Sequence, residues 1–101
     1  MIRKPQTHTI TITVDAQKIS LSHYKIVLSD GDTVEWQCHH PFLVHLGPRS
    51  PLEKMSYQDF QGKPDGGALK ASAPDDIYRY LVVVLYNDKF LTLDPDLVVR
   101  R

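Results

Sequence analysis

Thiol and imidazole groups stand close together in one short segment of this chain. Cys38, His39 and His40 are consecutive, and His45 follows shortly after them. Thiolate and imidazole bind zinc and copper ions, and a structural zinc site holds four such ligands in a tetrahedron. A cysteine and a histidine within mutual reach are also the basis of nucleophilic catalysis. The segment therefore raises two hypotheses, a metal site and a hydrolytic site.

The strand pattern around Cys38 weighs against both hypotheses. Strict alternation places Val34, Trp36 and Cys38 on one face of an expected strand. By the same alternation, His39 and His45 point the other way. A buried free cysteine behaves as a small apolar side chain. We therefore expect a core thiol beside surface histidines and a core tryptophan. Binding of copper or zinc by this Cys/His segment is the alternative.

Other patterns that could carry catalysis are weaker. Neither a nucleophile elbow nor a phosphate-binding glycine motif occurs in the sequence. The paired aspartates stand beside Gly or Pro in expected turns, where Asp caps backbone groups. We therefore expect a protein that is not an enzyme, with no catalytic residues and no cofactor. The pairs are Asp30/Asp32, Asp75/Asp76 and Asp94/Asp96.

Composition and charge limit the kind of protein further. The chain has 101 residues, and 12 basic side chains balance 12 acidic ones, so we expect one domain over residues 1–101 and no nucleic-acid partner. Its single cysteine cannot form an intrachain disulfide. No segment reaches the roughly 20 apolar residues of a membrane span, and no apolar stretch follows the charged N-terminus as a secretory signal requires. We expect a cytoplasmic protein without a membrane partner, or an extracytoplasmic one if the natural start lies upstream.

The hydrophobic pattern predicts an all-β fold. Residues 7–14 alternate between threonines and mostly apolar residues, which is typical of a strand with one solvated face. A break in phase at Ser22-His23 indicates a bulge or a bend between sheets. The expected strands cover residues 7–14, 19–21, 24–28, 33–38, 43–46, 78–86, 90–93 and 97–99.

Two turns and one strand stand out within this pattern. Gly31 is free to adopt a positive φ in a tight turn. The run from Leu81 to Tyr86 is apolar on both faces, which predicts a central strand covered on each side. Asn87-Asp88 then signals a hairpin, and a kink is expected at the Asp94-Pro95 pair.

Residues 47–74 break the strand pattern and predict a long irregular insertion. Four of the seven prolines and four of the five glycines fall here, and a loop of this length is usually functional or contains structure of its own. A helical turn within 52–61 and a short strand at 69–72 are the expected elements. Either the insertion binds a protein partner or an identical subunit, or it is a lid that seals one end of the domain. The expected apolar anchors, and hypothetical partner-binding residues, are Leu52, Met55, Tyr57 and Phe60.

Three motifs resemble the cupredoxin family. Gly31-Asp32-Thr33-Val34-Glu35-Trp36 is similar to the segment that precedes the first copper histidine of many cupredoxins. Tyr78-Arg79-Tyr80 resembles the aromatic pair that leads into the copper-binding cysteine. Asp94-Pro95-Asp96-Leu97-Val98-Val99 resembles the end of small bacterial cupredoxin-like proteins without an assigned activity. The resemblance implies a Greek-key β-sandwich or barrel.

The ligands of a blue-copper centre are missing from this chain. Such a centre needs two imidazoles and a thiolate in a plane, with a weak axial ligand. No histidine follows His45, no methionine follows Met55, and no cysteine accompanies Cys38. The resemblance therefore implies a copper-less cupredoxin-like domain. We expect it to serve as a non-catalytic interaction or structural module.

Overall fold

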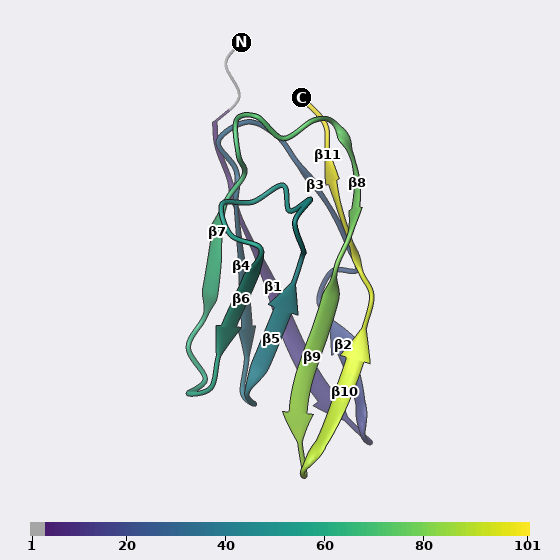
Figure 1. Cartoon of the computed structure of the whole chain (residues 1–101). Coiled ribbons are helices and arrows are strands. Elements are labelled where there is room, and N and C mark those ends of the chain that lie inside the picture. Colours follow the sequence, from purple (N-terminus) through teal and green to yellow (C-terminus); the bar gives the residue numbers. More distant parts are fainter. Residues whose placement is uncertain (1–3) are drawn as a thin grey trace.

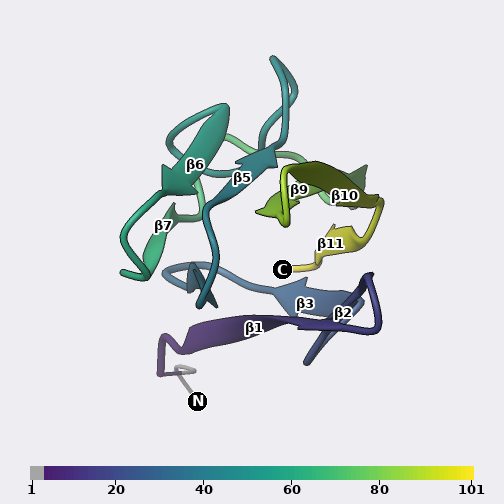
Figure 2. The ribbon, with the colours of Figure 1, turned by 90° about the horizontal axis from the view of Figure 1, so that it is seen from below.

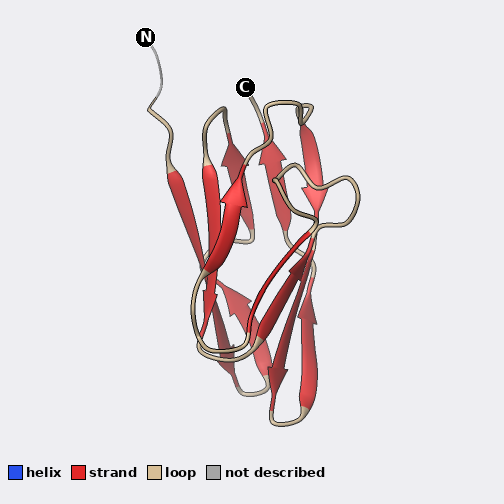
Figure 3. Ribbon diagram, turned by 60° about the vertical axis from the view of Figure 1, so that its left-hand side comes forward, coloured by secondary structure: helices blue, strands red, loops and turns tan. Residues whose placement is uncertain are grey.

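The computed structural model describes residues 4–101. Over this range the chain forms eleven strands and no helix, which confirms the predicted all-β class (Figure 1; strands in red in Figure 3). The described residues accordingly include no helix able to cross a membrane. The strands are β1 (Thr7–Asp15), β2 (Lys18–Leu21), β3 (Lys25–Leu28), β4 (Thr33–Cys38), β5 (Phe42–His45), β6 (Ser56–Asp59), β7 (Asp65–Ala68), β8 (Asp76–Arg79), β9 (Leu81–Tyr86), β10 (Lys89–Leu93) and β11 (Asp96–Val99).

The strands form three sheets around a shared core. Two four-stranded sheets have the orders β2-β1-β4-β7 and β10-β9-β5-β6, and a three-stranded sheet has the order β3-β11-β8. The pairs β1/β4 and β3/β11 are parallel, whereas the other pairs are antiparallel. Seen from below, β1 and β2 lie opposite β5, β9 and β10 (Figure 2). Many neighbours in a sheet are distant in sequence, so the fold depends on crossovers between sheets.

Alternation along β4 supplies the centre of the core. Val34, Trp36 and Cys38 are all buried, which confirms the prediction for Trp36 and Cys38. The Trp36 ring lies 5.6 Å from the ring of Tyr57 and 5.5 Å from the ring of Tyr80, measured between centroids. Burial of apolar surface stabilises a fold by roughly 25 cal/mol per Å². Trp36 therefore contributes strongly to stability by joining residues of different sheets.

Two-residue turns connect two of the hairpins, β1–β2 and β9–β10. Asn87 and Asp88 join β9 to β10 with φ angles of 51° and 61°, which is the left-handed geometry of a type I′ turn. The predicted hairpin is therefore confirmed. Ala16 and Gln17 join β1 to β2 with φ angles of 50° and 64°, although neither residue type is typical of this conformation.

Residues 78–86 are not one strand, as the apolar run predicted, but parts of two strands in different sheets. β8 pairs with β11, whereas β9 pairs with β5 and β10. Between them, the backbone N–H of Tyr80 donates a hydrogen bond of 3.0 Å to the carbonyl oxygen of Pro95. The predicted kink at Asp94-Pro95 therefore lies beside a second break, at Tyr80. The hydrophobic pattern did not reveal this break, because buried side chains continue through it on both sides of Tyr80.

Residues 47–74 are less irregular than expected. β6 pairs with β5, and β7 pairs with β4, so the segment adds an edge strand to each four-stranded sheet. An isolated bridge joins Leu52 to Leu69. The predicted helical turn within 52–61 is wrong, and the predicted strand at 69–72 lies instead at Asp65–Ala68.

The glycines of β7 explain why the pattern missed this strand. A Cβ atom on Gly67 would lie 2.1 Å from Tyr57 Oη, and one on Gly66 would lie 2.0 Å from the carbonyl oxygen of Val34. Only glycine allows the backbone to approach so closely. Glycines that indicated a loop in the sequence therefore serve close packing in a strand.

Candidate functional site

The thiol of Cys38 belongs to the core. It ends β4 with 4% of the residue exposed, and burial raises the pKa of the thiol above its ordinary value. The backbone N–H of His40 donates to Cys38 Sγ at 3.5 Å. Burial and a raised pKa are typical of a structural cysteine, because reactive cysteines are partly exposed and have lowered pKa values.

Of the neighbouring histidines, His39 lines the same hollow as Cys38, whereas His40 and His45 do not. His39 and His45 are exposed, as the alternation predicted, and His40 is half-buried. The ring of His40 packs edge-on against Tyr86, with centroids 4.9 Å apart. Across residues 4–101, no three His, Cys, Asp or Glu side chains come together in a way that could hold a metal ion.

The four anchors expected in residues 47–74 divide into two pairs. Leu52 and Tyr57 are buried, 0% and 1% exposed, and the N–H of Lys54 donates to Tyr57 Oη at 3.1 Å. Both side chains are part of the core, as expected of anchors, and their burial leaves them little surface for direct contact with a partner. Met55 and Phe60 are exposed, at 57% and 63%, and they remain available for contact.

Phe60 borders an apolar surface that the sequence analysis missed. We call this surface the outer apolar face, because its strands β5 and β9 turn the alternate side chains into the core. Leu43 lies opposite Val83, and Leu85 lies opposite Phe90, in the register of the sheet. The outer apolar face consists of Pro41, Leu43, Phe60, Val83, Leu85 and Phe90.

A groove with a volume of about 210 Å³ runs over this face. Phe90 is 74% exposed, Phe60 63% and Leu85 38%. Gln58 and Phe42 complete the lining, so no charged side chain lines the groove. An apolar, uncharged hollow of this kind suits apolar groups, and its lining side chains include no acid, base or nucleophile.

The prediction that β9 is covered on both sides is therefore wrong. Val82 and Val84 are buried in the core, but Val83 and Leu85 lie on the open outer side. The run that is apolar on both faces was the sequence signal of this site. It indicated a second covering layer, which the described chain does not supply.

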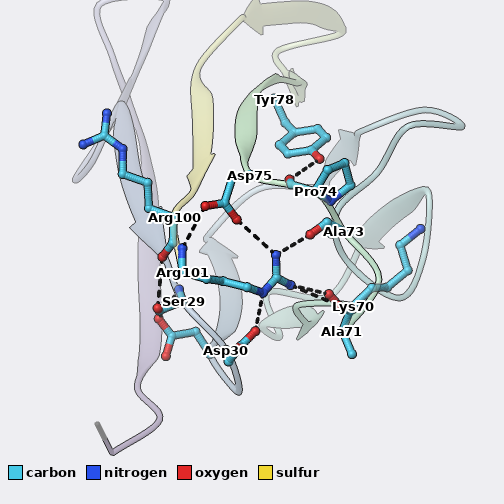
Figure 4. A network of polar contacts seen from close by, with 11 residues as sticks. Ser29, Asp30, Lys70, Ala71, Ala73, Pro74, Asp75, Tyr78, Arg100 and Arg101 are labelled. Atoms are coloured by element: carbon cyan, nitrogen blue, oxygen red, sulfur yellow. Dashed lines mark hydrogen bonds and ion pairs between the residues drawn. The ribbon is translucent and has the colours of Figure 1, made fainter.

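A network of polar contacts surrounds Arg101 (Figure 4), at the opposite end of the molecule from the β9–β10 turn (Figure 1). The guanidinium of Arg101 forms ion pairs with Asp30 and Asp75, the latter at 3.4 Å. It also donates to the carbonyl oxygens of Lys70 at 2.8 Å and of Ala73. Both carboxylates help to raise the pKa of this guanidinium above its ordinary value, the contact with Asp30 most.

The Arg101 network connects segments that are distant in sequence. It joins the turn before β4 to the loop before β8, and the backbone N–H of Arg101 donates to Asp75 at 3.1 Å. The carboxylates of Asp30 and Asp75 were expected to cap backbone groups, and their ion pairs with Arg101 are contacts that the turn pattern did not indicate. The guanidinium of Arg100 points away from the network (Figure 4).

Asp32 does cap backbone groups, as its turn predicted. Its carboxylate is fully buried and accepts hydrogen bonds from the N–H groups of Gln6, at 3.0 Å, and Ser29, at 3.1 Å. His8 Nε2 lies 3.0 Å from the same carboxylate. Together these contacts fasten β1 and the residues just before it to the turn before β4.

The outer apolar face is thus the feature best suited to binding. Comparison with protein-family models and with curated protein sequences finds no match to this chain. The function is therefore argued from the geometry of the described residues.

Proposed function

We propose that this chain is a non-catalytic, copper-less cupredoxin-like domain that acts as an interaction module. The observation that carries the proposal is the uncharged groove of the outer apolar face, with Phe60 and Phe90 exposed at its borders. Binding through this face needs no cofactor and no reactive group. A protein partner with apolar side chains matches its chemistry.

The size of the face supports a binding role. A buried aromatic side chain covers about 150–250 Å², so Phe60, Leu85 and Phe90 together expose roughly 300–400 Å² at the fractions given above. Contiguous apolar patches of a few hundred Å² on monomers are often functional. A patch of this kind is also unfavourable in water unless something covers it at least part of the time.

Two observations support the cupredoxin-like assignment. The motif that resembles cupredoxins ends at Trp36 on β4, in the middle of the core. The sheet orders also require crossovers between packed sheets, as a Greek key does.

The copper-less part of the proposal depends on the residues after Tyr80. Val82 and Val84, which follow it, are buried aliphatic side chains. Cys38 stands before this point in the chain, and its thiol has a raised pKa. We expect that adding Cu(II) to the purified protein produces no intense thiolate-to-copper absorption band. A stoichiometric band would overturn this part and revive electron transfer or metal binding by the Cys/His segment.

The binding part is tested by capture with matched variants. The wild-type chain, a Phe60→Asp/Phe90→Asp variant and an Ile77→Asp variant would be immobilised side by side. Ile77 is 55% exposed but lies on β8, in a different sheet, so it controls for the introduction of an acid at an exposed apolar position. We expect a partner retained by wild type and by Ile77→Asp to be lost from the double variant. Equal retention by all three would contradict the proposal.

A further inference from the structure

We propose that a second copy of this chain covers the outer apolar face, in a weak two-fold dimer. The inference rests on the proposed function, because it names the partner of the same face. In this dimer, Phe90 of each copy enters the groove of the other. An arrangement of this kind is isologous, so the same surface serves both copies and the contact closes without forming a fibre.

The face contains both halves of a complementary contact. Phe90 is 74% exposed, the largest exposed fraction among the large apolar side chains described. The groove beside it has a volume of about 210 Å³, and an apolar cavity of about 150 Å³ is large enough to bind benzene. One phenyl ring therefore fits the groove. A two-fold axis near the centre of the face repeats this contact.

The charges around the face allow two copies to approach. In the sequence, Asp88 and Lys89 precede Phe90, and Asp59 and Lys63 stand on either side of Phe60. Each of these short segments contains one acid and one base, so a two-fold arrangement that brings one segment against the other meets no excess of like charge. The formal net charge of the chain is +0 at pH 7, which removes long-range repulsion between copies.

The area sets the strength of the dimer. With roughly 300–400 Å² exposed by the three main side chains of each copy, the pair buries about 600–1,000 Å² when some neighbouring surface is included. Stable complexes usually bury at least about 1,200 Å². The dimer is therefore weak, with a dissociation constant of about 10 µM to 1 mM.

Sedimentation of the purified full chain tests the inference. We expect the weight-average mass of wild type to rise from 11.5 kDa toward twice that value as the concentration increases from about 10 µM to about 1 mM. Phe90→Asp should raise the dissociation constant at least about tenfold, because the dimer would have to bury an unpaired carboxylate. Phe60→Asp should act in the same direction, and Ile77→Asp should leave the constant unchanged. Circular dichroism establishes that each variant is folded.

Two results would overturn the dimer. One is a wild-type mass that stays at 11.5 kDa up to about 1 mM. The other is a dimer that survives Phe90→Asp and Phe60→Asp. Its loss in Ile77→Asp would then place the contact on the sheet that contains β8. A monomeric wild type that still retains a partner through the outer apolar face would leave the proposed function standing. A monomeric wild type that also retains no partner through the outer apolar face would refute both the dimer and the proposed function.

Discussion

Trp36 Nε1 donates a hydrogen bond of 3.2 Å to Tyr80 Oη in the interior of the molecule. The two rings meet edge to face, with centroids 5.5 Å apart. Trp36 lies on β4, and Tyr80 lies at the break between β8 and β9. The bond therefore ties a four-stranded sheet to the point where the chain passes between the other two sheets.

Removing the acceptor of this bond should weaken the fold. In Tyr80→Phe, the buried indole N–H loses its partner, which costs about 1–3 kcal/mol of unfolding free energy. Urea denaturation followed by tryptophan fluorescence measures the change. Tyr24→Phe is the control, because Tyr24 is 51% exposed and should change the free energy by less than about 0.5 kcal/mol. Equal effects of the two variants would show that the Trp36–Tyr80 bond contributes little.

The same phenol should make stability depend on alkaline pH. Burial, the largest cause, raises the pKa of Tyr80 to about 12, against an ordinary value of about 10. The pKa of Tyr80 is higher in the folded state than in the unfolded state. The contribution of the neutral phenol to the free energy of unfolding is therefore complete below about pH 10 and is lost as the pH rises toward about 12. Phenolate absorbance should show a late titration step that is missing in Tyr80→Phe. A wild type without this step would contradict the assignment.

Two side chains of the 47–74 segment offer a matched test of its role. Leu52→Ala should cost about 2–5 kcal/mol, because Leu52 is fully buried and its truncation leaves a cavity. Met55→Ala should cost less than about 0.5 kcal/mol, because this side chain is 57% exposed. Chemical denaturation measures both. A small effect of Leu52→Ala would mean that the segment is not part of the core.

The Arg101 network should hold the loop before β8 in place. Arg101→Gln removes the contacts with Asp30 and Asp75, so amides of residues 70–75 should exchange with solvent about five- to tenfold faster. Arg100→Gln is the control, since the guanidinium of Arg100 lies outside the network. Hydrogen exchange read by mass spectrometry distinguishes the variants. Equal exchange in both would show that the network is dispensable for this loop.

Much of the fold was predictable because its signals are local. Alternation placed Trp36 and Cys38 in the core, and Asn87-Asp88 marked a hairpin that the structure contains. The break at Tyr80 was not predictable in the same way. It depends on a hydrogen bond to Pro95, which stands far away in the sequence and leaves no trace in the apolar pattern.

The candidate site was harder to predict because its signals had two meanings. A strand that is apolar on both faces, such as β9, is usually covered on both faces, yet Leu85 is 38% exposed. Gly66 and Gly67 indicated a loop but serve the close packing of β7. The contacts of Arg101 cross between distant segments, so no spacing in the sequence could indicate them.

Photo-crosslinking in cells that produce the protein tests the role of the outer apolar face most directly. The variants Phe90→p-benzoylphenylalanine and Ile77→p-benzoylphenylalanine place the same probe on two exposed sites in different sheets. We expect a discrete adduct from position 90, with a second copy of the chain or with another protein, and none of comparable yield from position 77. Adducts from position 77 alone, or none from position 90, would contradict it.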